Sequence, residues 1–325
     1  MRHSEGEDSS LPQQSRTVFG LLQAVVAALL FVALLLAGRY FVHLPITTKA
    51  STICAELRCR DVSVDSVADL EAALKRFHIL NIDPNEVVPA VLFDSYPADL
   101  PAISSISKRK KIFFHTLLPM ALVVQNEIAA ERRTLKSIIS KLAGLPNIIF
   151  DNKLLDWQQK LSQEQARQAL RLAGKYKSDR VEELLKRVQP VPVSLIMAQG
   201  AIESAWGGSR FALDGNNIFG IWTWDEKDDG LVPARRDVGK NHRVKSFKSL
   251  LAAVREYCLI LNRQPAYRRF RRLRQITSDP TVMAIGLSNY SSRRKLYVQD
   301  VQNIIRTNNL RRYDRCRLEG STPHA

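Results

Sequence analysis

Residues that bind metals are scarce in this chain. Its 325 residues include four cysteines and six scattered histidines, and no cysteine pair has the spacing of a zinc site. We therefore expect neither a metal ion nor another cofactor. Cys54 and Cys59 are close enough to form a small loop, whereas Cys258 and Cys316 are far apart. Four cysteines allow three complete disulfide pairings, and a reduced, buried Cys258 is an equally good interpretation.

Acidic residues are also in deficit. The chain has 48 Lys and Arg against 32 Asp and Glu, and residues 261–317 hold 14 basic and 3 acidic side chains. A surface of this kind attracts polyanions. The most obvious basic cluster consists of Arg268, Arg269, Arg271, Arg272 and Arg274. No nucleic-acid-binding motif accompanies it, so we expect no nucleic acid partner, and a solvated face remains the simplest interpretation of any one arginine.

Charged residues are missing altogether from Val18 to Gly38. These 21 residues include one strongly polar side chain, Gln23, and at ~1.5 Å per residue they match a hydrocarbon layer of ~30 Å. A cleaved signal peptide usually has a shorter apolar stretch and an A-x-A site, but Leu35 lies two residues before Ala37 here. We predict a single transmembrane helix over 18–38 that follows a cytoplasmic tail, residues 1–17. Basic residues flank both ends of this helix, so their distribution does not predict which end faces the cytoplasm.

No internal repeat or low-complexity tract is evident beyond the anchor. Residues 39–107 contain one weakly amphipathic helix, 64–77, and a run of prolines from Pro84 to Pro101 that favours an extended connector, so we predict a stem. We then expect a mostly α domain with a β-hairpin lobe between Trp224 and Arg243. Its predicted helices span 108–142 with an interruption at Pro119, then 163–176, 179–188, a short helix through Glu203, 249–262, 279–287 and 293–307.

The most informative segment is AQGAIESAWGGSRFALDGNNIFGIWTW, residues 198–224. Leu195, Ala198 and Ile202 recur at helical spacing, and Gly207 and Gly208 are expected to supply the left-handed residue that ends the helix. Glu203 thus lies near a helix end, and Trp206 follows three residues later. A carboxyl group against apolar surface keeps its proton near neutral pH, as a general acid must, although a solvated surface glutamate is the alternative.

This segment resembles the catalytic motif of the glucosaminidase domain, glycoside hydrolase family 73. The resemblance rests on residues 201–207 and 216–221, continues in 247–257, 290–291 and 297–298, and covers roughly 108–313. It implies a lysozyme-like fold with a helical accessory region, residues 108–188, a catalytic core, residues 189–313, and a tail, residues 314–325. It also implies a β-N-acetylglucosaminidase that acts on peptidoglycan or a related glycan. Such an enzyme works outside the cytoplasm, so we expect the domain on the periplasmic side of the inner membrane.

Glycoside hydrolysis usually needs two carboxylates, and the second one is not obvious here. Many family members carry a glutamate in the β lobe, but residues 231–247 contain none. Asp237 is the nearest carboxylate by spacing, followed by Asp229, Asp228 and Glu226. Substrate assistance by the acetamido group is the alternative, and Tyr290 matches the family tyrosine placed for such a role. We prefer Tyr290 to Asp237.

Several other side chains are candidates for substrate contacts. The amides offer hydrogen bonds, and the aromatic rings offer flat faces for sugars, although Phe219 and Tyr290 also fit an ordinary core role. Trp222 and Trp224 alternate along a strand-like run and so point the same way. The full set of predicted contacts is Gln199, Trp206, Asn216, Asn217, Phe219, Trp222, Trp224 and Tyr297.

The sequence therefore predicts a membrane-anchored glycosidase with Glu203 as the general acid. A lytic transglycosylase is one alternative, although its G-L-M-Q-like segment is absent, and an amidase-type wall hydrolase is another, although no nucleophile or metal site is found. A catalytically idle wall-binding protein is the third, because the β-lobe glutamate is missing. Peptidoglycan peptides, anionic lipid headgroups and lipopolysaccharide phosphates are the polyanions that a basic surface would meet outside the cytoplasm.

Overall fold

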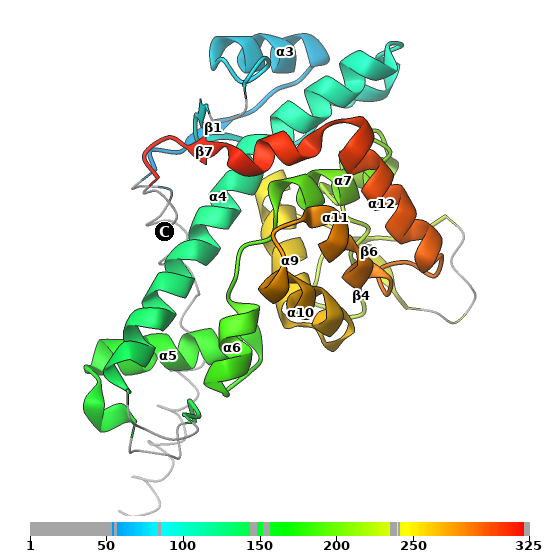
Figure 1. Ribbon diagram of the computed structural model, residues 1–325. Coiled ribbons are helices and arrows are strands. Elements are labelled where there is room, and N and C mark those ends of the chain that lie inside the picture. Colours follow the sequence, from blue (N-terminus) through cyan, green and yellow to red (C-terminus); the bar gives the residue numbers. More distant parts are fainter. Residues whose placement is uncertain are drawn as a thin grey trace, which may run out of the picture. The chain divides into compact units, whose positions relative to one another are not determined.

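Helices make up most of the regular structure. The computed structural model describes residues 54, 57–83, 86–143, 148–151, 157–234, 239 and 241–321, all within one unit of the chain, Thr52–Ala325 (Figure 1). The α-helices are α3 (Val67–Arg76), α4 (Ile106–Lys141), α5 (Gln163–Tyr176), α6 (Val181–Arg187), α7 (Val193–Ser204), α8 (Arg210–Gly215), α9 (Leu250–Arg263), α10 (Arg268–Ile276), α11 (Pro280–Met283) and α12 (Lys295–Thr307). The 3-10 helices are η1 (Leu100–Ala102), η2 (Gln158–Lys160), η3 (Pro265–Tyr267), η4 (Ala284–Leu287) and η5 (Leu310–Arg315).

The strands are short and form three small sheets. They are β1 (Arg60–Val62), β2 (Val87–Val88), β3 (Val91–Phe93), β4 (Trp222–Thr223), β5 (Gly230–Leu231), β6 (Arg243–Lys245) and β7 (Arg317–Leu318). The expected β lobe is confirmed as the antiparallel sheet β4-β6-β5, in which Trp222 lies opposite Val244 and Gly230 opposite Lys245. The other two sheets are parallel pairs, β1 with β3 and β2 with β7.

Helix α4 carries the core of the unit. Its first half packs against α7 and α9, and its second half packs against α5 and α6, where it forms a second apolar cluster with residues such as Trp157 and Leu184 (Figure 1). The interruption predicted at Pro119 is wrong, because the helix continues through that residue. Pro119 removes one backbone donor, but the side chains from Ile112 to Val124 are buried, and this packing holds the helix together.

The predicted membrane span, Val18 to Gly38, and the tail before it lie outside the described residues. Among the residues that the structure describes, one helix, α4, is long and apolar enough to cross a bilayer. However, 89% of its most apolar window is buried inside the protein. Burial of this kind is typical of a core helix, so α4 is weak evidence for a membrane segment.

Residues 57–107 differ from the extended stem that the prolines indicated. Leu70 of α3, Phe93 of β3 and Leu100 of η1 are fully buried in the same core as α4 and α7. The Tyr96 hydroxyl donates to the backbone carbonyl of Phe113 at 3.0 Å. The predicted tail also joins the fold, because Val87 of β2 lies opposite Arg317 of β7. Pro89 directly follows β2 and Pro101 lies in η1, while apolar side chains near them, such as Val91 and Leu100, are buried in the core.

The predicted helix bounds agree closely with the structure in most of the domain. Residues 163–176 match α5, and residues 293–307 match α12 apart from two residues at the start. The helix expected over 279–287 is instead a turn of α-helix, α11, followed by the 3-10 helix η4. Helix α10 was not predicted, because its arginines dominate the pattern and hide the apolar residue Phe270, which is fully buried.

Candidate active site

Glu203 lies in the last turn of α7, and both ends of this helix are fixed by side chains. At the start, the Asp314 carboxylate accepts hydrogen bonds from the Ser194 amide at 2.9 Å and from the Ser194 hydroxyl at 2.7 Å. At the end, the Ser204 hydroxyl accepts from the Gly207 amide at 2.8 Å. Unsatisfied amides and carbonyls at helix ends need such partners. The glutamate is therefore held on a helix that cannot easily fray.

The end of α7 differs from the expected glycine cap. Ala205 and Trp206 both adopt the left-handed conformation, with φ of 51° and 60°, before Gly207 at 78°. Two consecutive non-glycine residues in this region are uncommon, and such strain clusters at functional sites. Gly207 is nevertheless required, because a Cβ there would lie 2.9 Å from Leu100. The turn closes directly after the glutamate.

The loop after α8 lies against the Glu203 carboxylate. Gly220 has φ of 63°, and a Cβ on it would lie 3.1 Å from the Glu203 Oε2 atom. The buried Asn217 side chain holds this loop, because its Oδ1 accepts from the Ile221 amide at 3.0 Å and its Nδ2 donates to the Lys245 carbonyl at 2.7 Å. Gly220 thus leaves room for the carboxylate, and Asn217 fixes the loop that surrounds it.

A chain of hydrogen bonds ends at Glu203. The Tyr257 hydroxyl donates to Gln199 Oε1 at 2.5 Å, and Gln199 Nε2 donates to the Tyr297 oxygen at 2.8 Å. Tyr297 in turn forms a side-chain hydrogen bond with Glu203. Because the Tyr297 oxygen already accepts from Gln199, its own proton is directed to the carboxylate. Gln199, one turn before Glu203, is fully buried and therefore positions Tyr297.

Burial determines the protonation of Glu203. Loss of hydration raises the pKa of this carboxyl above its ordinary value, and the hydrogen bond from Tyr297 opposes the effect only in part. The same contact and burial raise the pKa of Tyr297, so its phenol stays protonated. The residue is partly exposed rather than sealed. Glu203 is therefore a carboxyl group of raised pKa that solvent can reach.

Four tyrosines surround this carboxyl group. Tyr257, Tyr267, Tyr290 and Tyr297 all interact electrostatically with Glu203, and burial raises the pKa of each, in Tyr267 to about 12. Tyr290 stacks on Tyr297 with ring centroids 5.5 Å apart. Sequence reasoning missed Tyr257 and Tyr267 as site residues. Tyr257 does end the segment 247–257 in which the family resemblance continues, and that is the signal that could have found it.

Comparison with known proteins agrees with this geometry. Residues 178–310 match the model of the glucosaminidase family, described as mannosyl-glycoprotein endo-beta-N-acetylglucosaminidase. This segment is a glucosaminidase-family domain. The match contains α7, the loop around Gly220 and all four tyrosines, and it identifies the chain as a glycoside hydrolase.

One curated relative and two solved structures are similar to the chain. Protein bax of Escherichia coli is 29% identical over 205 residues, which are 61% of this chain and 69% of that protein. The catalytic domain of the autolysin Auto from Listeria monocytogenes is 19% identical, with a TM-score of 0.32, over 55% of this chain and 96% of that one. The glycoside hydrolase domain of FlgJ from Salmonella typhimurium is 20% identical, with a TM-score of 0.29, over 43% and 97%.

Other predicted contacts of the glucosaminidase domain have mainly packing roles. Phe219 is fully buried and stacks on Tyr257 at 4.1 Å, and Asn216 ends α8 in the left-handed conformation. Trp206 packs edge-on against Phe114 of α4, and Lys110 Nζ lies 4.6 Å from the centre of its ring. The Trp206 indole is therefore held by α4.

Two tryptophans of the β lobe remain exposed. Trp222 is 44% and Trp224 66% accessible, whereas Thr223 between them is buried. Trp222 begins β4 and Trp224 follows its last residue, so alternation along the chain predicts that both indoles lie on the same side. They are the most exposed aromatic rings in the described part of the lobe.

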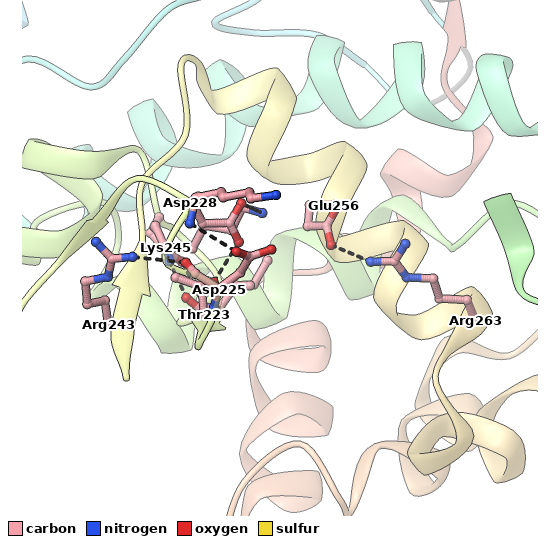
Figure 2. A network of polar contacts seen from close by, with 10 residues as sticks. Thr223, Asp225, Asp228, Arg243, Lys245, Glu256 and Arg263 are labelled. Atoms are coloured by element: carbon pink, nitrogen blue, oxygen red, sulfur yellow. Dashed lines mark hydrogen bonds and ion pairs between the residues drawn. The ribbon is translucent and has the colours of Figure 1, made fainter. Parts of the chain in front are cut away.

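Two acidic residues of the β lobe, Asp225 and Asp228, form hydrogen bonds with other residues of the same lobe. Asp228 accepts from the Thr223 hydroxyl at 2.6 Å and from Lys245 Nζ at 2.9 Å, and these bonds lower its pKa (Figure 2). Arg243 donates to the Asp225 carbonyl at 3.0 Å. Asp237 lies outside the described residues. No described carboxylate contributes to the pKa of Glu203.

The basic cluster of α10 divides into buried and exposed members. Arg271 and Arg274 are buried and donate to backbone carbonyls, among them Leu261 and Gln189, at the ends of neighbouring helices. Arg268 is exposed and lines a cavity of about 390 Å³ between α6 and α10. All the residues that line this cavity are charged: Arg180, Glu182, Glu183, Lys186, Arg187 and Arg268. Two of the five arginines are thus structural.

Proposed function

We propose that this protein is a cell-wall β-N-acetylglucosaminidase that uses Glu203 as its general acid. The observation that carries the proposal is the environment of this carboxyl group, which is partly buried at the end of α7 with a raised pKa and a single hydrogen-bonded partner, Tyr297. A carboxyl group that keeps its proton near neutral pH can donate it to a leaving oxygen. The substrate is the β-1,4 bond after N-acetylglucosamine in peptidoglycan or a related glycan.

The first step cleaves the glycosidic bond. Glu203 transfers its proton to the glycosidic oxygen as the bond from that oxygen to C1 of N-acetylglucosamine breaks, and the acetamido oxygen of the same sugar forms a new bond to C1. Water then attacks C1 and releases the acetamido oxygen, while the Glu203 carboxylate takes the proton of that water. The carboxyl group is restored, and the configuration at C1 is retained.

Tyr290 supports this substrate-assisted route. Its hydroxyl donates to the Phe219 carbonyl at 2.7 Å, so its proton is already engaged and its oxygen is left as an acceptor. Such an acceptor suits the N–H of the acetamido group, whose oxygen must point at C1. Tyr290 also stacks on Tyr297, which fixes the ring next to the acid. We therefore assign the second role to Tyr290 rather than to Asp237.

The exposed indoles and the predicted anchor complete the proposal. Trp222 and Trp224 offer flat faces on which sugar rings of a long glycan pack. The uncharged residues 18–38 would hold the enzyme in the inner membrane with its domain on the periplasmic side, because peptidoglycan lies outside the cytoplasm. Attachment to the membrane would keep the catalytic domain close to the cell wall.

The test is digestion of isolated sacculi by the full-length protein in detergent. We expect Glu203→Gln to fold normally and to lower the release of soluble fragments by at least ~100-fold, because the amide cannot donate a proton as an acid does. Glu182→Gln, an exposed carboxylate on α6, is the matched control and should keep full activity. Wild-type activity of the Glu203 variant would remove the proposed mechanism.

The products of the same digestion distinguish the competing enzymes. A glucosaminidase leaves free reducing N-acetylglucosamine ends, which borohydride reduction and mass spectrometry detect. Anhydro-muramyl ends would instead identify a lytic transglycosylase, and cleaved stem peptides with intact glycans an amidase. If no bond is cleaved although the protein binds sacculi, the chain is a wall-binding protein and the proposed function is wrong.

A further inference from the structure

Two thiols lie together at the start of the folded unit. The Cys59 amide donates to the Cys54 carbonyl at 2.9 Å, which closes a short loop between them. The two side chains are also in hydrogen-bond contact with each other, and both are partly buried against the main core. Contact between two cysteine side chains across a closed backbone loop is the arrangement that a disulfide needs.

The surroundings of this pair favour thiol chemistry. Arg255 of α9, which forms an ion pair with Glu127 of α4, lies close enough to act electrostatically on both thiols. The hydrogen bond from Cys59 lowers the pKa of Cys54, with a smaller contribution from Arg255, while burial and Glu127 oppose it. The pair therefore contains one thiol that ionises readily and one that donates to it. The thiolate is the form that attacks a disulfide.

The other two cysteines lie deeper in the fold. Cys258 is buried on α9, and burial raises the pKa of its thiol. Cys316 is also buried, and its sulfur lies 3.9 Å from the Asp83 carbonyl oxygen. All four thiols are reduced in the structure, and the described contacts between cysteines join Cys54 and Cys59.

We propose that Cys54 and Cys59 form a disulfide in the mature protein and that this bond closes the loop at the junction between the membrane-proximal chain and the catalytic unit. The proposal rests on the location of the domain outside the cytoplasm, where disulfides persist. The loop lies beside the Arg255–Glu127 ion pair that joins α9 to α4. The bond restricts the unfolded chain at this junction, so it stabilises the start of the unit against local unfolding.

The oxidation needs a disulfide oxidant, such as a thiol–disulfide oxidase or oxidised glutathione. The Cys54 thiolate attacks one sulfur of the oxidant, which forms a mixed disulfide and releases the first thiol. The Cys59 sulfur, after loss of its proton, then attacks the Cys54 sulfur and releases the second thiol. Two electrons and two protons pass to the oxidant, and the protein gains one S–S bond.

Peptide mapping tests the bond directly. The full-length protein is collected from cells by acid quenching, its free thiols are blocked with iodoacetamide, and it is digested with trypsin without reduction. Trypsin cleaves after Lys49, Arg58 and Arg60, so the two cysteines fall on separate peptides, residues 50–58 and 59–60. We expect these two peptides to be recovered as one cross-linked species that reductant separates. Cys258→Ala is the matched control and should leave the species unchanged.

A second measurement uses the purified protein and does not depend on its location. Incubation of the reduced protein with oxidised glutathione should form the same species and raise the melting temperature by a few degrees, and Cys54→Ser/Cys59→Ser should show no such rise. Blocked thiols at both positions in both experiments, or a link from either cysteine to Cys316, would overturn the proposal. Sacculus digestion by protein in which Cys54 and Cys59 are both recovered as blocked thiols would show that the proposed function stands while the disulfide proposal fails.

Discussion

At the scale of single residues, the chemistry depends on how one carboxyl group is surrounded. Burial raises the pKa of the Glu203 carboxyl group, and a hydrogen bond from Tyr297 lowers that pKa in part. Gln199 cannot act on substrate, because both of its amide ends are used by Tyr257 and Tyr297. Gln199 donates to the Tyr297 oxygen and so directs the Tyr297 hydroxyl proton toward Glu203. The pKa of the proposed acid therefore depends on a chain of hydrogen bonds that runs from Tyr257 of α9 through Gln199 and Tyr297 to Glu203.

Removal of the Tyr297 proton should change the pH dependence of the enzyme. In Tyr297→Phe, the Glu203 carboxylate loses the donor that stabilises its charged form, so the pKa of the acid rises further. Activity requires the protonated acid, and we therefore expect the alkaline limb of the kcat/KM profile to move to higher pH. The plateau should fall by about tenfold or less, the worth of one hydrogen bond.

The control for this shift is Tyr267→Phe. Burial and, to a smaller extent, Glu203 raise the pKa of Tyr267, but Tyr267 is not among the groups that shift the pKa of Glu203. This variant should keep the alkaline limb in place. A Tyr297→Phe profile that moves to lower pH, or that keeps the wild-type limb, would contradict the assigned direction of the relay.

The identity of the second catalytic group is also a question of single residues. Tyr290→Phe removes the oxygen that accepts from the acetamido group, and we expect a loss of ~100-fold in kcat with a smaller change in KM. Asp237→Asn should stay within about threefold of the wild type, because we assign the second role to Tyr290. Steady-state kinetics on a soluble chitooligosaccharide measure both. The reverse order of effects would assign the role to Asp237.

At the scale of elements, α7 is positioned by residues that are distant in sequence. Asp314 of η5 caps its first turn through Ser194, while Pro192, the residue before the helix, makes no side-chain cap. Ser194 is the second residue of the helix, and its amide needs a partner from outside the helix. The predicted tail, residues 314–325, thus supplies the residue that holds the acid-bearing helix.

Loss of this cap should weaken the domain. Asp314→Ala leaves the Ser194 amide and hydroxyl without their acceptor, and we expect the free energy of unfolding to fall by ~1 kcal/mol, as for other capping residues. Asp314→Asn keeps an oxygen acceptor and should lose about half as much or less. Urea denaturation followed by circular dichroism measures both. Equal losses in the two variants would show that the charge, and not the hydrogen bonds, is what matters.

At the scale of the whole molecule, the folded unit is larger than the family match. The family model begins at residue 178, yet α4 fills the core and β3 and η1 bury Phe93 and Leu100 against it. The end of the chain returns to this region through the pairing of β7 with β2. Helix α7, which carries the proposed acid, therefore depends on chain segments from before and after the matched residues.

A fragment that starts at residue 108 should consequently fail to fold well. It lacks α3, β1, β2, β3 and η1, which bury Leu70, Phe93 and Leu100, and the loss of even one such side chain costs 2–5 kcal/mol. A fragment of residues 52–325 contains the entire unit and should unfold cooperatively. Thermal denaturation and size-exclusion chromatography compare them. A cooperative, monomeric 108–325 fragment would show that the first segment is dispensable.

Local pattern predicted much of this protein. The spacing of apolar residues determines α5, α7 and α12, and the short motif from Ala201 to Gly207 pointed to Glu203, because helical periodicity and turn residues act over a few positions of chain. The loss of helical period after Trp224 likewise indicated the β lobe. These features are set by interactions between residues close in sequence, so they can be predicted from the sequence.

Only the tertiary structure decided how distant residues meet. It brought Tyr257 and Tyr267 to Glu203, placed Asp314 on Ser194, kept α4 helical through Pro119 and turned the supposed stem into core. Each outcome is set by packing and hydrogen bonds between segments many residues apart, where burial outweighs local preference. The type of a residue, such as proline or arginine, indicates its local conformational preference. Its conformation and burial in the folded protein depend on the segments that pack against it.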